Sequence, residues 1–150
     1  MRSELHLAMR APYERVFALA AEVERWPEIL PHYRYVRPLA DPRGERHFAM
    51  GARRGPIPVS WRAIQRPLVD ERRIEFVHTG GVTKGMRVAW RFAPPDDGGS
   101  IDVSIEHHLE LGWPLIGELA ARHVIGPQFI EAIAGRTLRR IRDLAEAPAK

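Results

Sequence analysis

Alternating hydrophobic and polar residues open the chain and then give way to a helical period. In "SELHLAMR" (3–10), Leu5, Leu7 and Met9 fall on one face, which predicts a half-buried strand. The next segment, "APYERVFALAAEVERW" (11–26), repeats its apolar residues at helical spacing. Pro27 and Pro31 then bracket a second helical turn at most, because proline removes an amide donor. We therefore expect one strand followed by two short helices.

Residues 33–111 contain alternating runs and no helical stripe. Segments rich in glycine, proline and aspartate, such as "DPRGE", "RRGPIP" and "TGGVTKG", separate these runs as turns do. Six strands fit between the turns, and "GMRVAWRF" (85–92) and "SIDVSIEHHLEL" (100–111) are the clearest. Sequential strands joined by short turns predict an antiparallel meander with one dry face.

The helical period returns after "GWP" (112–114). A helix is expected to begin at Leu115, and the apolar residues from Ile130 to Ala145 occupy one arc of a helical wheel. Gly126-Pro127 should bend or interrupt it, since proline cannot continue unbroken helical bonding. The pattern predicts a long amphipathic C-terminal helix.

Length and composition indicate one soluble domain over residues 1–150, with a core at about 3–147. A chain of 150 residues suits a single core, and 45% hydrophobic with 28% charged residues is ordinary for a globular protein. No stretch approaches the roughly 18 apolar residues of a membrane span. The N-terminus lacks the continuous apolar run of a signal peptide, so a cytoplasmic location is expected.

Charge and cysteine content narrow the possible chemistry. The absence of cysteine excludes disulfides and thiolate catalysis. The net charge of +4 invites a nucleic-acid hypothesis, but the basic residues are scattered among acids, so we expect no nucleic-acid binding. No cluster of histidines and carboxylates has metal-ligand spacing. We therefore expect no metal and no cofactor.

The ordered set of segments resembles one known family. In "VERWPEILPHYRYV", "GGVTKGMRVAWRF", "IEHHLEL" followed by "GWP", and "IAGRTLRRIRDLAE", the chain is similar to the polyketide cyclase/dehydrase and coenzyme Q-binding branch of the START-like (Bet v 1-like) superfamily. The resemblance implies an α+β helix-grip fold of order β-α-α-β-β-β-β-β-β-α. Its curved seven-stranded antiparallel sheet would wrap around the long C-terminal helix, and a cavity between them would hold a hydrophobic small molecule.

His107 is the candidate for chemistry. By alternation it shares a face with Ile105 and Leu109 and should point towards the helix. An imidazole there can donate or accept a hydrogen bond or carry a proton near neutral pH, and the alternative is a core histidine satisfied by a neighbour. His108 must face the other way, so the pair cannot easily hold one metal ion.

Aromatic residues supply the other cavity candidates. Trp61 and Trp90 are expected in the wall, and His78 joins them if Ile74 and Phe76 point inward, although Phe76 itself is more typical of plain core packing. The pattern leaves the facing of Tyr33 and Tyr35 open. Trp26 either forms the cavity rim or only packs a corner after the helix. The full predicted set is Trp26, Tyr33, Tyr35, Trp61, Phe76, His78, Met86, Trp90, Ile105, His107, Phe129 and Ile133.

Three functions remain open at this stage. The first is binding of a polyketide, aromatic, quinone or lipid molecule by a monomer or homodimer. The second is a polyketide cyclase/dehydrase, in which His107 and a tyrosine or tryptophan would act on the ligand. The third is a ligand-sensing regulatory module that binds another protein through exposed surface around Trp26.

Overall fold

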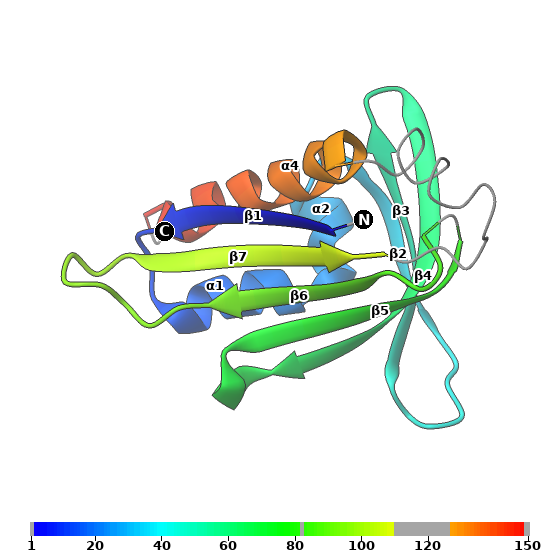
Figure 1. Cartoon of the computed structure of the whole chain (residues 1–150), viewed down its shortest axis with the longest axis horizontal. Coiled ribbons are helices and arrows are strands. Elements are labelled where there is room, and N and C mark those ends of the chain that lie inside the picture. The colour runs from blue at the N-terminus through cyan, green and yellow to red at the C-terminus, as the bar shows by residue number, and fades with distance from the viewer. Residues whose placement is uncertain (1, 82, 110–126, 149–150) are drawn as a thin grey trace.

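The computed structural model contains a strongly curved antiparallel sheet with the order β1-β7-β6-β5-β4-β3-β2, and the described helices lie on one face of it (Figure 1). The structure describes residues 2–81, 83–109 and 127–148, and for residues 127–130 it describes the backbone only. The elements are β1 (Arg2–Met9), α1 (Tyr13–Ala21), η1 (Val23–Arg25), α2 (Trp26–Ile29), β2 (Tyr33–Leu39), β3 (Arg46–Arg54), β4 (Ile57–Leu68), η2 (Val69–Glu71), β5 (Arg73–Gly81), β6 (Arg87–Phe92), β7 (Ile101–His108) and α4 (Pro127–Glu146). The predicted helix-grip fold is confirmed.

The helix expected over residues 11–26 is shorter than predicted. Helix α1 ends at Ala21, because the backbone of Glu22 has φ −81° and ψ 65°, outside the helical region. The chain then forms the 3-10 turn η1 and the short helix α2, in which Pro27 occupies the first turn, where no amide donor is needed. Trp26 therefore begins α2 and does not end α1.

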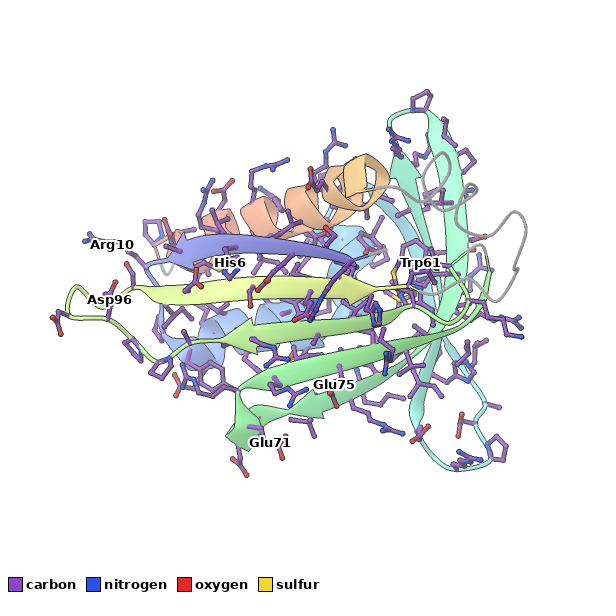
Figure 2. The ribbon with its side chains drawn as sticks, in the orientation of Figure 1. His6, Arg10, Trp61, Glu71, Glu75 and Asp96 are labelled. Carbon is purple, nitrogen blue, oxygen red and sulfur yellow. The ribbon has the colours of Figure 1, made fainter. Side chains whose placement is uncertain are left out.

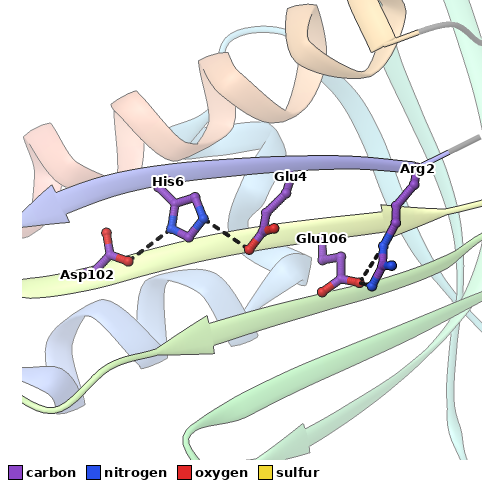
Figure 3. Close-up of polar contacts among 5 residues, drawn as sticks. All are labelled: Arg2, Glu4, His6, Asp102 and Glu106. Carbon is purple, nitrogen blue, oxygen red and sulfur yellow. Dashed lines mark hydrogen bonds and ion pairs between the residues drawn. The ribbon is translucent and has the colours of Figure 1, made fainter.

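Strand β1 forms one edge of the sheet, where it pairs with β7, a strand from much later in the chain. On the outer face of this pair, Arg2 Nε donates to Glu106 Oε1 at 3.1 Å. His6 is exposed on β1 (Figure 2) and lies between Glu4 and Asp102, with a nitrogen 3.0 Å from each carboxylate (Figure 3). These contacts are exposed, so they contribute little to the free energy of folding individually. They are consistent with the pairing register of β1 and β7, the first and last strands of the sheet in sequence.

Two strands carry irregularities that change which side chains face inward. The register of β2 against β3 shifts between Tyr33 and Tyr35, and that of β4 against β5 shifts between Arg62 and Ala63. A bulge adds a residue to one strand and so reverses the facing of the residues beyond it. The first shift lies next to Tyr33, and the second lies between the paired segments that contain Trp61 and His78. Both therefore affect which side chains reach the concave face.

Helix α4 lies against the concave side and contributes one wall of the core. Its buried residues include Ile133, Leu138 and Ile141, whereas Arg136 and Arg139 are exposed, as the amphipathic pattern predicts. The helix begins at Pro127, beside the predicted interruption. The helix start predicted at Leu115 lies outside the described residues.

Candidate functional site

A cavity of about 90 Å³ lies between the concave face of the sheet and α4. Its walls come from α2, β2 to β7, the β5–β6 turn and α4. The lining residues are Trp26, Tyr33, Met50, Val59, Trp61, Phe76, His78, Thr83, Met86, Val88, Trp90, Ile105, His107, Ile133, Ala134 and Thr137. None of these described residues is an acid, an arginine or a lysine.

Aromatic rings make up one side of the cavity. Trp26 packs edge-on against Tyr33 with ring centroids 5.0 Å apart, and it also lies 6.3 Å from Trp90 and 6.4 Å from Phe76. Its indole Nε1 donates to the Leu19 carbonyl at 3.0 Å, which satisfies the one polar atom of the side chain. Trp26 is only 3% exposed. Trp26 itself is therefore not part of an exposed surface, because helix α2 turns the ring inward, and a protein-binding surface beside it stays a prediction.

His78 is held at the opposite side by two neighbours. Its ring stacks parallel to Trp61 with an interplanar angle of 2° and a centroid separation of 5.8 Å. Its Nδ1 lies 2.6 Å from Thr83 Oγ1, and Thr83 is buried in the β5–β6 turn. Burial lowers the pKa of His78 to about 3, helped by electrostatic interaction with His107. The imidazole is consequently neutral at pH 7.

His107 lies near the end of β7, between β1 and β6, with its ring in the cavity wall. It is 7% exposed, and its buried Nδ1 makes no hydrogen bond with the described residues. Burial lowers the pKa of this histidine to about 4. An unpartnered polar atom in a buried site carries an unfavourable desolvation energy, which a ligand group that bonds to it would relieve. His107 thus places a neutral imidazole ring in the cavity wall, and a ligand would have to displace neighbouring side chains to reach its covered Nδ1.

A second polar group joins α4 to β2 behind the aromatic side. Thr137 Oγ1 donates to the Ile133 carbonyl at 2.9 Å and lies 2.8 Å from His32 Nε2. Because the hydroxyl has only one proton, His32 Nε2 must be the donor in that contact. Burial, with a smaller contribution from Arg136, lowers the pKa of His32 to about 4. Burial raises the pKa of Tyr33, so its hydroxyl stays protonated.

The structure brings most of the predicted cavity residues together. Ten of them line the cavity: Trp26, Tyr33, Trp61, Phe76, His78, Met86, Trp90, Ile105, His107 and Ile133. That any of them binds a ligand remains a prediction. The side chain of Phe129 lies outside the described residues.

Tyr35 is the predicted residue that faces away from the cavity. It is half-buried on the outer face, where Arg37 lies over its ring at 4.6 Å from the centroid. The bulge after Tyr33 pairs Tyr35 with Gly51, and a Cβ on Gly51 would come within 2.3 Å of the Tyr35 ring. Simple alternation would have kept Tyr33 and Tyr35 on the same face, and the bulge separates them.

The sequence prediction missed six lining residues: Met50, Val59, Thr83, Val88, Ala134 and Thr137. Val88 could have been found, because it alternates with Trp90 on the same predicted face. Thr137 stands on the apolar arc of the C-terminal helix, where a polar residue is itself a signal. Thr83 had no such signal, since it lies in a glycine-rich turn whose course the pattern does not define.

Neither metal ligation nor a membrane span appears in the described part of the chain. No group of three or more histidine, cysteine or acidic residues there could hold a metal ion. No described helix combines the length and the hydropathy needed to cross a membrane.

A curved antiparallel sheet that grips a C-terminal helix around an apolar cavity defines the START/Bet v 1-like class of folds. Within this class, the chain belongs to the family described as polyketide cyclase/dehydrase and lipid transport, whose model matches residues 9–124. No curated protein matches the chain by sequence.

Solved structures with the same fold include both unassigned and enzymatic proteins. A START superfamily protein from Mycobacterium smegmatis is 12% identical, with 97% of each chain covered and a TM-score of 0.73. The Zhui aromatase/cyclase from Streptomyces sp. R1128 is 17% identical, with 97% of this chain and 93% of that one covered and a TM-score of 0.69. The di-domain aromatase/cyclase StfQ of the steffimycin biosynthetic pathway is 23% identical, with 95% of this chain and 44% of that one covered and a TM-score of 0.70.

Proposed function

We propose that the cavity binds an uncharged, ring-bearing hydrophobic molecule. The observation that carries this proposal is the lining itself, which combines large apolar and aromatic side chains with no formally charged residue among those described. Its two histidines have pKa values of about 3 and about 4, so both are neutral at pH 7. A carboxylate, phosphate or ammonium group would lose its hydration there without gaining a counter-charge.

The size of the cavity favours a ring over a long acyl chain. Its volume of about 90 Å³ is smaller than the roughly 300–1,000 Å³ of sites for drug-sized molecules. An apolar cavity of about 150 Å³ is known to accept benzene. Because about 90 Å³ is smaller than that, even a single substituted ring would have to extend through the opening or displace side chains, and a polyketide, quinone or lipid would have to do so much further.

The proposal can be tested by changing the charge of the ligand and by reducing the volume of the cavity through mutation. We expect calorimetric titration to detect binding of p-cresol and toluene, and no binding of p-toluate, which has the same ring and methyl group with a carboxylate added. Ala134→Phe should abolish binding by filling the cavity, because Ala134 lines it. The matched control is Ala132→Phe, since Ala132 is exposed on α4 outside the lining.

Either of two results would contradict the binding proposal. Tight binding of p-toluate would show that the site tolerates charge. Equal binding of p-cresol by the folded Ala134→Phe and Ala132→Phe variants would show that the ligand lies elsewhere.

A cyclase/dehydrase activity is the second candidate. The observation that favours it is the unpartnered Nδ1 of His107, a neutral imidazole in the wall of an apolar cavity. Such a group can polarise a bound carbonyl by hydrogen bonding, as enolisation and aldol closure require. The similarity to solved aromatase/cyclases supports this candidate at the level of the fold.

A further inference from the structure

A threonine in the β5–β6 turn contacts the histidine that faces the cavity from β5. Thr83 is 4% exposed, and its hydroxyl lies 2.6 Å from His78 Nδ1. It is the only described hydroxyl recorded in a side-chain hydrogen bond with that ring. Because Thr83 is buried, little water can compete for its hydroxyl, and the contact with His78 is correspondingly strong.

The turn holds both partners rigidly. The backbone of His78 is bonded on both sides, with its amide donating to the Met86 carbonyl at 2.8 Å and its carbonyl accepting from the Gly85 amide at 2.9 Å. The Thr83 carbonyl accepts from the Met86 amide at 2.9 Å. These backbone hydrogen bonds fix the position of Thr83 relative to His78, and so they hold the hydroxyl beside the imidazole.

The His78 ring has little freedom left. Trp61 covers one face of the ring in a parallel stack, and Thr83 fixes the Nδ1 edge. In a neutral imidazole one nitrogen donates and the other accepts, so the direction of the Thr83 contact also determines the role of Nε2. Nε2 makes no hydrogen bond recorded among the described residues, and His78 lines the cavity.

His107 stands close to this group. Strand β6 pairs with both β5 and β7, and Val88 is opposite Phe76 on one side and His107 on the other. His78 is therefore one inward position along β5 from the row that contains His107. The two neutral rings therefore lie near each other in the cavity wall, close enough for His107 to influence the pKa of His78.

We propose that Thr83 is a positioning residue that sets the tautomer of His78, and that His78 and His107 together bind an uncharged hydroxyl or carbonyl oxygen of the ligand. This inference rests on the proposed binding function and adds the polar part of the ligand to it. It predicts that the hydrogen-bonding preference of the cavity depends on a side chain in the turn that need not touch the ligand.

The test compares p-cresol with toluene, which differ only in the hydroxyl. In Thr83→Val, which keeps the shape of the side chain, we expect the ratio of p-cresol to toluene affinity to fall about tenfold, the size expected for one buried hydrogen bond. Toluene affinity should change less than about twofold. Thr83→Ser should restore the ratio, and Thr83→Ala serves if the valine variant fails to fold.

Thr79→Val is the matched control. Thr79 follows His78 on β5, but its hydroxyl lies 2.8 Å from His47 Nε2, away from the cavity lining. The same substitution there should leave the affinity ratio unchanged. An affinity ratio in Thr83→Val within twofold of the unaltered protein would overturn the assignment, as would an equal loss in Thr79→Val.

Imidazole nitrogen chemical shifts provide a readout that does not depend on ligand binding. In the unaltered protein, NMR should show His78 as a single neutral tautomer, and in Thr83→Val as a mixture of both. Unchanged nitrogen shifts would refute the positioning role even if the cavity binds neither probe. Failure of the unaltered protein to bind p-cresol and toluene, with the tautomer change present, would count against the proposed function and leave the positioning of His78 standing.

Discussion

At the scale of single residues, His107 and His108 show how one step along a strand separates two kinds of chemistry. His107 is buried in the cavity wall with an unpartnered Nδ1. The His108 Nδ1 accepts from Arg87 Nη2 at 3.1 Å on the outer face. The two histidines are adjacent on β7 but face opposite sides of the sheet. A substitution at His108 is therefore a matched control for the same substitution at His107.

If the cavity catalyses enolisation, His107→Gln should slow it and His108→Gln should not. We expect the unaltered protein to accelerate deuterium incorporation into the methyl group of acetophenone in D2O, followed by NMR. Replacement of His107 should lower this rate about 100-fold, the scale of losing a hydrogen bond to a developing oxyanion. Equal rates in the two variants would remove His107 from the reaction, and the absence of acceleration in the unaltered protein would count against the cyclase candidate.

Period-2 alternation predicted the facing of residues in regular strands and failed at a bulge. It oriented His107 and Trp90 correctly, because β6 and β7 pair without a register shift. It could not orient Tyr35, because the bulge after Tyr33 arises from the pairing with β3 and leaves no mark in the local sequence. The contact between Thr83 and His78 was likewise hidden, since it depends on the path of a turn.

At the scale of elements, the bulged pairing of β4 with β5 depends on a glycine. Gly81 has φ +89°, and a Cβ there would lie 2.6 Å from the Ser60 carbonyl oxygen and 2.7 Å from Trp61 Cα. Both of those atoms belong to the backbone of β4, so neither can move without moving the strand. A side chain at position 81 would therefore push β5 away from β4 and displace Trp61.

Gly81→Ala should therefore destabilise the protein more than Gly99→Ala does. Gly99 has a similar φ of +82° but no atom within 4 Å of an added Cβ, so it reports the conformational cost without the clash. That cost is about 1–2 kcal/mol, and we expect Gly81→Ala to exceed it by at least about 1 kcal/mol in urea unfolding. Equal free energies of unfolding would show that β4 and β5 separate easily at this point.

Element types were predictable from sequence, whereas several boundaries were not. The switch between period 2 and period 3.6 located the helices and strands around the sheet. The break after Ala21 escaped prediction, because Glu22 is an ordinary helix residue and nothing in the local sequence marks its non-helical backbone. Strand β4 also begins at Ile57, inside the segment interpreted as a turn, because pairing with β3 outweighs the two prolines that flank this residue.

At the scale of the whole molecule, two buried histidines, His32 and His107, and the half-buried His78 make the free energy of unfolding depend on pH. Burial lowers the pKa of His32 and His107 to about 4 and that of His78 to about 3. The folded state disfavours their protonation, so their contribution is fully present above the unfolded histidine pKa of about 6.5 and is lost as the pH falls towards the folded values. His6 has the opposite sign, because its hydrogen bond to Asp102 raises its pKa, but it is exposed and should contribute little.

We expect the urea midpoint to fall as the pH is lowered from about 7.5 to about 5, a range above the titration of most carboxylates. His78→Gln should reduce this pH dependence, since the unfolded variant binds one proton fewer. Denaturation curves at several pH values would measure it. A midpoint that is constant over this range, or a slope unaltered in His78→Gln, would contradict the prediction.

The pairing of β1 with β7 has a consequence for how the protein is made. Arg2 and Glu106, which contact each other across these strands, are 104 positions apart. At roughly 5–20 residues per second, a ribosome takes several seconds to supply the partner of the first strand. Until then β1 has no neighbour in the sheet, and the wall that α4 provides is made later still. Because residues of α4 line the cavity, its walls are complete only after this helix has been synthesised and has packed on the sheet.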